Sequence, residues 1–445
     1  MESQQSAFRD EIVAPDSVRV LPTDHLEGTI AIPGDKVAAV HLSLATAVLT
    51  QESVIKNNHY CGDVLQIYDW LTSTGLVTIS RTQDEVRITP NRVAEVVDLS
   101  NLSSTRSNVC LVTPLALRDA AVLFKGTAGC GFTTRKVDKH FELMDAFGLS
   151  ISERGDLLEM TCAEPSKSVN FDCSATERNI PSVGVTCHAL MASLAYKNKM
   201  TLTNVALEPA PMALIEYVRR STNREIVLEG RTLTLGGVGE IEHRSAEVTL
   251  PPDVTVAGTY IAAVTAAGNG ELHLEGLPLT AIPDSMLETY EHMGIHIARI
   301  GATAVSAVVR QGDLAVPPDV SCGVWPGFPS DVAPMFAASV AGIGGRSEIT
   351  DNIYDKRSSH IEGLNDMGYE LATEGNKTVI QGHTPKRIGN VAVEALDIRS
   401  GAALIVGALG SSAESVTVTN YHQVYRGYAN LAAGLQTLGA KIEAV

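Results

Sequence analysis

The sequence predicts an α/β (α+β) fold in which two domains are each built from three copies of one repeated unit. Three observations lead to this prediction. The chain has 445 residues, which is too long for one ordinary hydrophobic core and makes two domains the expected number. A helix followed by two short strands recurs along the chain at intervals of roughly 70 to 75 residues, which is a period typical of internal repeats. A second type of helix, rich in small apolar residues, recurs with the same period.

In each copy an amphipathic helix ends at a glycine or an asparagine, and two short strands of alternating apolar residues follow. Examples are STGLVTISRTQDEVRITP from Ser73 and DMGYELATEGNKTVIQG from Asp366. These anchor residues fit the left-handed position that commonly ends a helix. The six anchors are Gly75, Gly148, Asn223, Gly294, Gly368 and Gly439.

The small-residue helices are apolar on most faces, so we expect them to be buried. They are DKVAAVHLSLATAVL, RSNVCLVTPLALRDAAVL, PSVGVTCHALMASLAY, VAGTYIAAVTAAGNG, SDVAPMFAASVAGIGG and DIRSGAALIVGALG. The last copy ends at Val445 after one strand, and the first strand of the chain is expected to supply the missing one. The predicted domains are therefore a discontinuous C-terminal-type domain (1–35 and 252–445) and an N-terminal-type domain (36–251), joined at Pro33-Gly34 and Pro251-Pro252.

The composition argues against several classes of protein. No apolar run reaches about 18 residues, so no membrane span is expected. The polar N-terminus is no signal peptide, and seven scattered cysteines without a C-x-x-C pair indicate a reducing, cytoplasmic setting. A net charge of −17 argues against nucleic-acid binding. The twelve histidines lack a helical H-x-x-x-H spacing, so no metal site is predicted.

The segment FKGTAGCGFTTRKVDKH, residues 124–140, places Cys130 between glycines and among basic residues. Neighbouring cations lower the pKa of a thiol and make it reactive. The glycines would let such a loop close over a substrate. We expect the other six cysteines to be inert core residues.

Nine motifs together resemble the enolpyruvyl (carboxyvinyl) transferases, most closely the UDP-N-acetylglucosamine 1-carboxyvinyltransferases. They are PGDKVAA, TRSNVCLVTPLALR, GCGFTTRKVDKH, PSVGVT, PDVTVAGTY, WPGFPSD, DKRSSH, LDIRSGAAL and HQVYRGYANL. The resemblance implies a two-domain inside-out α/β barrel of six repeated units, with the active site in the interdomain cleft. The shikimate-pathway branch shares GDK but lacks the cysteine loop, so that branch is disfavoured.

The resemblance implies transfer of the enolpyruvyl group of phosphoenolpyruvate to a secondary hydroxyl, with release of phosphate through a tetrahedral intermediate and without a metal or organic cofactor. Cys130 would protonate C3 of phosphoenolpyruvate or add to it covalently, and Asp331 would take the hydroxyl proton unless it only caps the following helix. Lys36 and Arg399 complete the implied catalytic set. The phosphoenolpyruvate clamp would consist of Lys36, Arg106, Arg135, Arg357, Arg399 and Arg426. Asp253 and Asp397 match further cleft positions.

The acceptor implied by the resemblance is a uridine nucleotide. Its implied binding residues are Arg135, Lys136, Val137, Asp138, His140, Ser182, Val183, Gly184 and Asp331. Four departures from the family pattern argue against the amino sugar: Val37 for an asparagine, Cys110 for an aromatic residue, Lys136 for a proline and Gly62 for a lysine. UMP, modified at its ribose 3′-hydroxyl as in nucleoside-antibiotic pathways, is therefore favoured over UDP-N-acetylglucosamine, and Lys136 would bind its phosphate. A non-catalytic, nucleotide-binding regulator is the alternative from another class. The sequence does not predict the oligomeric state.

Overall fold

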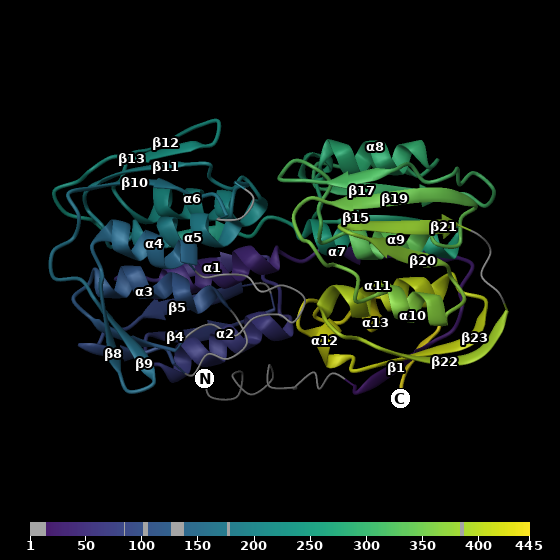
Figure 1. Ribbon diagram of the computed structural model, residues 1–445, viewed down its shortest axis with the longest axis horizontal. Coiled ribbons are helices and arrows are strands. Elements are labelled where there is room, and N and C mark those ends of the chain that lie inside the picture. The colour runs from purple at the N-terminus through teal and green to yellow at the C-terminus, as the bar shows by residue number, and fades with distance from the viewer. Residues whose placement is uncertain (1–14, 84, 101–105, 126–137, 176–178, 383–386) are drawn as a thin grey trace. The chain divides into compact units, whose positions relative to one another are not determined.

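The computed structural model describes residues 15–445 apart from 84, 101–105, 126–137, 176–178 and 383–386 (Figure 1). The chain divides into two compact units. The first comprises the described part of 1–33 together with 60–62 and 252–445, and the second comprises the described parts of 34–59 and 63–251. Among the described residues, no helix is both long enough and apolar enough to cross a membrane.

Six four-stranded sheets in the described residues share one plan. In each sheet two neighbouring strands at one end are parallel, and the other neighbouring strands are antiparallel. A parallel pair needs a crossover connection, and in four of these sheets one buried helix joins the two parallel strands directly, whereas in the other two the parallel strands lie far apart in the sequence. The predicted α/β fold of six repeated units is therefore confirmed.

The first unit contains three of these sheets. Their strands, in spatial order, are β16 (His296–Arg299), β17 (Ala304–Val309), β15 (Gly270–Glu275) and β2 (Leu26–Ala31); β18 (Val320–Cys322), β19 (Gly345–Asp351), β21 (Lys377–Gly382) and β20 (Leu371–Glu374); and β22 (Ile388–Glu394), β23 (Ala413–Thr419), β1 (Ser17–Val20) and β24 (Ile442–Ala444).

The second unit repeats the plan. Its strands, in spatial order, are β14 (Ala246–Thr249), β3 (Ser53–Lys56), β5 (Glu85–Pro90) and β4 (Val77–Arg81); β6 (Val96–Asp98), β7 (Ala121–Phe124), β9 (Leu157–Thr161) and β8 (Ser150–Arg154); and β10 (Ser168–Asp172), β11 (Lys199–Thr203), β13 (Thr232–Leu235) and β12 (Ile226–Glu229).

The first strand of the chain completes the last repeat. β1 lies between β23 and β24 and pairs antiparallel with both. In the other repeats this place in the sheet belongs to the last strand of the repeat itself. This confirms that the N-terminal strand supplies the strand missing after Val445. Similarly, β2 pairs with β15, which lies more than two hundred residues later in the sequence.

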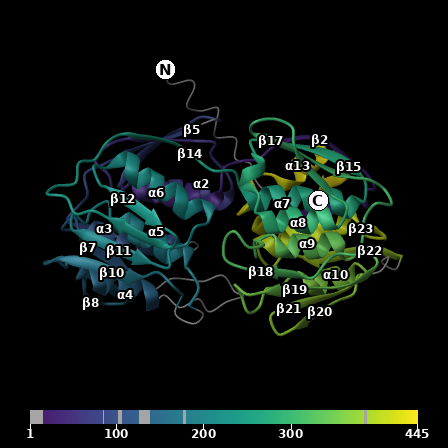
Figure 2. The same ribbon diagram turned by 90° about the horizontal axis from the view of Figure 1, so that it is seen from above.

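The small-residue helices form the centre of each unit, with the sheets around them (Figure 2). α7 (Val254–Ala267), α9 (Ala333–Val340) and α11 (Ile398–Leu409) pack against one another in the first unit. In the second unit α3 packs against both α1 and α5. The second unit's central helices are α1 (Lys36–Thr46), α3 (Val109–Ala116) and α5 (Val183–Ala192). Five of the six lie within the segments predicted to be buried helices, and α7 begins at Val254, two residues before its predicted segment.

The remaining helices are shorter or more amphipathic. They are α2 (Gly62–Ser73), α4 (Asp138–Phe147), α6 (Pro209–Ser221), α8 (Asp284–His292), α10 (Ile361–Asp366), α12 (His422–Tyr425) and α13 (Leu431–Thr437), with 3-10 turns η1 (Arg106–Asn108) and η2 (Leu279–Ala281).

The prediction that a left-handed residue ends the helix is confirmed in five of the six repeats. Gly75, Gly148, Gly294, Gly368 and Gly439 have φ angles between +71° and +101°. Asn223 is the exception, because α6 already ends at Ser221 and Thr222 is extended. The Asn223 amide instead hydrogen-bonds the backbone of Glu240 and Glu242, so it holds the following loop rather than ending the helix.

Candidate active site

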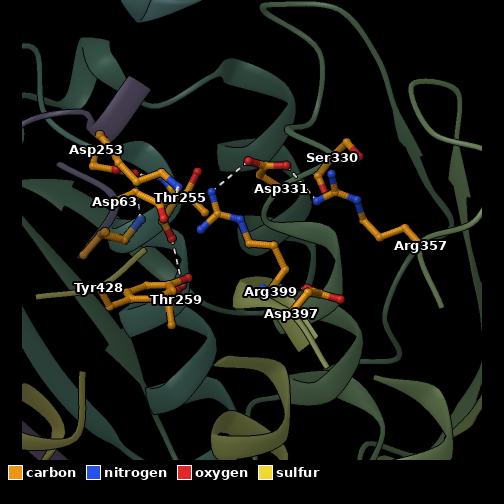
Figure 3. Close-up of polar contacts among 12 residues, drawn as sticks. Asp63, Asp253, Thr255, Thr259, Ser330, Asp331, Arg357, Asp397, Arg399 and Tyr428 are labelled. Carbon is orange, nitrogen blue, oxygen red and sulfur yellow. Dashed lines mark hydrogen bonds and ion pairs between the residues drawn. The ribbon is translucent and has the colours of Figure 1, made fainter. Parts of the chain in front are cut away.

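In the first unit, one carboxylate is shared by two arginines. Asp331 lies between β18 and α9, and its two oxygens accept hydrogen bonds from Arg357 Nη1 at 2.7 Å and Arg399 Nη2 at 2.8 Å (Figure 3). The Asp331 side chain is 39% exposed, whereas those of Arg357 and Arg399 are 7% and 13% exposed. Two nearly buried guanidiniums therefore hold a carboxylate that remains accessible.

The charges of this triad set its protonation state. Burial favours the neutral acid, but the positive charges of Arg399 and Arg357 outweigh it and lower the pKa of Asp331 below its usual range. Burial likewise opposes the charge of the two arginines, but Asp331 outweighs it and raises the pKa of both. At neutral pH the triad itself thus carries two positive charges and one negative charge.

Arg399 is positioned by the first turn of α11. Asp397 is the N-cap of this helix, and its carboxylate accepts hydrogen bonds from the backbone N–H groups of Arg399 and Ser400, each at 2.9 Å. Ser359 Oγ also donates to Asp397. A cation in the first turn of a helix faces the positive end of the helix dipole, which is unfavourable for folding. The same position becomes favourable once an anion binds there.

Two further groups surround Arg399. Its guanidinium lies 5.9 Å from the centre of the Tyr428 ring, and the Tyr428 hydroxyl is 2.8 Å from Thr259 Oγ1 on α7. Asp253 caps α7 through the N–H groups of Thr255 and Val256, and its charge also raises the pKa of Arg399. The predicted cleft residues Asp253 and Asp397 are therefore both helix N-caps next to or near Arg399.

Arg357 is fixed by a separate set of contacts. Its Nη1 donates to the Ser330 carbonyl at 3.1 Å, and its Nε lies 3.7 Å from Asp351 Oδ2. Its guanidinium lies 4.3 Å from the centre of the Tyr354 ring. Asp351 also accepts a hydrogen bond from Ser330 Oγ. These contacts hold the guanidinium plane in place independently of Asp331.

Asp331 does not act as a helix cap. The N-cap of α9 is Val332, which makes no side-chain cap hydrogen bond, and both oxygens of Asp331 face arginines instead. The interpretation of Asp331 as a helix cap is therefore wrong. Arg426, also predicted for the clamp, directly follows α12, and its Nη1 donates to Gln423 at 3.0 Å.

In the second unit, Lys36 forms an ion pair. It is the first residue of α1, directly after the N-cap Asp35, and its Nζ lies 3.0 Å from Asp63 Oδ2. The side chains of Lys36 and Asp63 are 15% and 9% exposed. Sequence reasoning missed Asp63, whose position in the first turn of α2 was the available signal.

Several predicted residues lie outside the described part of the chain. These are Cys130, Arg135, Lys136 and Val137, and also the side chain of Arg106, whose backbone begins η1. Their implied roles stay predictions.

The described residues predicted to bind a nucleotide lie at the starts of two helices. Asp138 and His140 belong to the first turn of α4, and Ser182 caps α5 by accepting a hydrogen bond from Val185 N–H. Val183 begins α5 and Gly184 follows it. A Cβ atom on Gly184 would lie 3.6 Å from His140 Nε2, so the imidazole packs directly over this turn. The structure thus brings His140, Ser182 and Gly184 together.

The six described cysteines are buried. Burial raises the pKa of Cys173 and Cys322 to about 12, and it also raises the pKa of Cys110, Cys162 and Cys187. Buried thiols of this kind remain protonated at neutral pH and are poor nucleophiles.

The fold and this arginine–carboxylate site define an enolpyruvyl transferase. The family model described as EPSP synthase (3-phosphoshikimate 1-carboxyvinyltransferase) matches residues 20–435, and the chain belongs to this family of carboxyvinyltransferases.

Among proteins with similar sequences, the UDP-N-acetylglucosamine 1-carboxyvinyltransferase of Thermotoga petrophila is 29% identical over 426 residues, covering 94% of this chain and 96% of the relative. The UDP-N-acetylglucosamine 1-carboxyvinyltransferase 1 of Streptococcus agalactiae is 26% identical over 432 residues, covering 94% and 97%.

Among solved structures, the enolpyruvyl transferase NikO from Streptomyces tendae has a TM-score of 0.84 at 20% identity, covering 97% of this chain and 99% of that one. EPSP synthase from Acinetobacter baumannii has a TM-score of 0.72 at 16% identity, covering 96% and 99%. These structural likenesses establish the shared fold.

Proposed function

We propose that this enzyme transfers the enolpyruvyl group of phosphoenolpyruvate to a secondary hydroxyl of a uridine nucleotide, with UMP as the favoured acceptor, and releases phosphate. The observation that carries the proposal is the Asp331 carboxylate held between Arg357 and Arg399. The reaction needs fixed cations for the phosphate and carboxylate of the donor, and a base for the acceptor hydroxyl. The triad offers both kinds of group within one hydrogen-bonded cluster.

The low pKa of Asp331 bears on how it would serve as a base. While both arginines hold it, the carboxylate is a weak proton acceptor. An incoming phosphate or carboxylate competes for the same guanidinium N–H groups, since arginine forks bind such anions in the same way. As the arginines turn to the anion, the pKa of Asp331 rises. We therefore infer that donor binding itself makes Asp331 basic enough to accept the hydroxyl proton.

The proposed steps balance as follows. The acceptor oxygen bonds to C2 of phosphoenolpyruvate while its proton passes to Asp331, and C3 receives a proton from Cys130. The resulting tetrahedral intermediate loses phosphate and a proton from C3, which restores the double bond as an enol ether. Fixed cations stabilise the charge on the departing phosphate.

The preference for UMP rests on the residues that replace the family's sugar-binding groups. Cys110, which stands where an aromatic residue is expected, is 1% exposed and packs against the first turn of α5 near the Gly184 carbonyl. Val37 has an apolar side chain at the position of an amide. Loss of a hydrogen-bonding group at a specificity site changes substrate preference by large factors. Neither residue offers the polar contacts that an amino sugar requires.

UDP-N-acetylglucosamine is the second candidate acceptor. It is favoured by the sequence relatives, since those described above carry that activity in their names and align over 94% of this chain. A non-catalytic regulator is the third possibility, and the complete Asp331–Arg357–Arg399 triad argues against it.

The test is phosphate release from phosphoenolpyruvate with UMP and with UDP-N-acetylglucosamine in parallel. Wild type, Cys130→Ala and the matched control Cys162→Ala would be compared. We expect release with UMP, its loss in Cys130→Ala, and its retention in Cys162→Ala. Release with UDP-N-acetylglucosamine alone would replace UMP by the amino-sugar nucleotide, and release with neither would overturn the proposed acceptor class.

A further inference from the structure

Three metal-binding side chains converge in the second unit, although they come from three different helices. Cys110 is the second residue of α3, His140 the third residue of α4, and His188 the sixth residue of α5. One donor atom from each lies within 4.8 Å of the other two. We propose that Cys110, His140 and His188 bind one Zn²⁺ ion and leave the fourth coordination position to water or to a ligand atom.

The donor set suits zinc. Thiolate and imidazole are its common protein ligands, at about 2.3 Å for sulfur and about 2.0–2.1 Å for nitrogen. Tetrahedral coordination at these lengths separates the donor atoms by roughly 3.3–3.7 Å. The two Nδ1 atoms of His140 and His188 are already 3.0 Å apart. Small side-chain rotations would therefore bring the three donors to the required separation without moving the helices.

The orientation of His188 provides a second, independent observation. Its Nε2 lies 2.7 Å from Thr113 Oγ1 on α3. Metal-binding histidines almost always use their second ring nitrogen to donate a hydrogen bond, which fixes the tautomer and the ring plane. In the tautomer whose Nε2–H donates to Thr113, the Nδ1 of His188 presents a lone pair to His140 Nδ1. His188 is fully buried, so its ring is held by these contacts.

His140 completes the arrangement from the more exposed side. Its ring stacks on that of His188, with centres 5.2 Å apart, and its Nε2 faces Gly184. Coordination through Nδ1 would place the Nε2–H toward the start of α5. The Cys110 thiol lies 3.8 Å from the Gly184 carbonyl, which is a weak contact that a metal–sulfur bond readily replaces.

Binding changes the proton count in a defined way. A cysteine without metal is a thiol at neutral pH, and this holds for Cys110. Zn²⁺ then forms a bond to sulfur and displaces that one proton to solvent, while the two neutral imidazoles bind through lone pairs. The proton between the two Nδ1 atoms moves to His140 Nε2 and stays on the ring. One proton is released for each Zn²⁺ bound, which is the usual coupling between metal affinity and pH.

The experiment is calorimetric titration of the metal-free, full-length protein with Zn²⁺ in two buffers of different ionisation enthalpy at pH 7.5. We expect one ion bound and about one proton released per chain. Cys110→Ser, His140→Ala and His188→Gln should each abolish this binding. Cys187→Ser, which alters a buried cysteine adjacent to His188 but outside the cluster, should retain it. Circular dichroism and thermal unfolding would establish that each variant is folded.

Three further variants separate a real site from non-specific thiol binding. Thr113→Val keeps the shape of the side chain but removes the hydrogen bond to His188, and it should weaken Zn²⁺ binding by about 10- to 100-fold. Thr113→Ser should restore it. Cys130→Ser should leave the binding intact. Loss of binding in Cys130→Ser, or equal binding in Cys110→Ser and wild type, would overturn the proposal, as would a wild type that binds no Zn²⁺. Because the readout is metal binding, the result is independent of which acceptor the enzyme uses.

Discussion

Replacing Asp331 by asparagine should separate the two roles inferred for the arginine triad. The substitution keeps the size of the side chain but removes the negative charge that Arg357 and Arg399 share. We expect two effects of opposite sign: the enzyme should turn over more slowly and bind the donor's phosphate more tightly. A purely structural role for Asp331 predicts neither effect in this combination.

The magnitudes follow from the geometry. Two unit charges about 4 Å apart near a protein surface interact by about 4 kcal/mol. Asp331 is 39% exposed, so solvent screens much of this attraction, and about 1.4 kcal/mol is a reasonable discounted value. That energy corresponds to about tenfold tighter binding of an anion that competes for the arginines. Loss of a general base lowers kcat by roughly 10²- to 10⁴-fold.

The assays are calorimetric binding of inorganic phosphate and initial rates of phosphate release. Asp366→Asn is the matched control, because it removes one negative charge from an exposed position on α10 of the same unit. We expect the control to change neither quantity by more than about twofold, consistent with weak exposed electrostatics. Unchanged or weaker phosphate binding in Asp331→Asn would refute the competition between carboxylate and anion. A kcat within threefold of wild type would refute the role of Asp331 as base.

Three further predictions follow from other residues. Burial lowers the pKa of His360 to about 4, so the folded state disfavours the protonated ring; this contribution to stability is intact above pH 6.5 and is lost toward pH 4, by up to about 3 kcal/mol in the free energy of unfolding. In denaturant titrations wild type should therefore lose more stability between pH 6.5 and pH 4 than His360→Gln does. Gly401→Ala should lower the free energy of unfolding by about 1–3 kcal/mol, because the new Cβ would lie 2.5 Å from Val424 Cγ2. In the control Gly389→Ala the new Cβ has no atom within 4 Å, so its free energy of unfolding should be nearly that of wild type. A thiol reagent should modify one cysteine in the native protein and none in Cys130→Ser, since the six described cysteines are buried; modification of two or more in the native state would contradict this.

The repeat architecture could be predicted from the sequence because each repeat carries two independent local signals. The first signal is a small-residue helix that is apolar on most faces and is therefore buried. The second is a glycine in the left-handed conformation, which ends the second helix of most units. Asn223 marks the limit of this reasoning. Asparagine also tolerates the left-handed conformation, but at this position its amide finds backbone partners at Glu240 and Glu242 and the chain turns by another route.

The site was only partly predictable, because its chemistry depends on pairings across repeats. The sequence indicated Asp331, Arg357 and Arg399 separately, but not that one carboxylate would be shared by both arginines. It indicated Lys36 without its partner Asp63, which lies 27 residues later on another helix. Such pairs have no characteristic spacing, since they depend on how different helices and loops pack against one another.

The same reasoning explains why the sequence predicted no metal site. Spacing motifs detect ligands that share one helix or one loop, whereas Cys110, His140 and His188 stand on three helices separated by 30 and 48 residues. What unites them is the packing of α4 and α5 on α3, together with the hydrogen bond between His188 Nε2 and Thr113 that orients the His188 ring. An imidazole pair beside a buried thiol is an unusual way to fill a core that could hold only apolar side chains, because each buried polar group must find a partner. Without an ion these groups are paired through the His140–His188 contact, the His188–Thr113 hydrogen bond and the contact of Cys110 with the Gly184 carbonyl, and coordination of one ion would replace the first and the last of these.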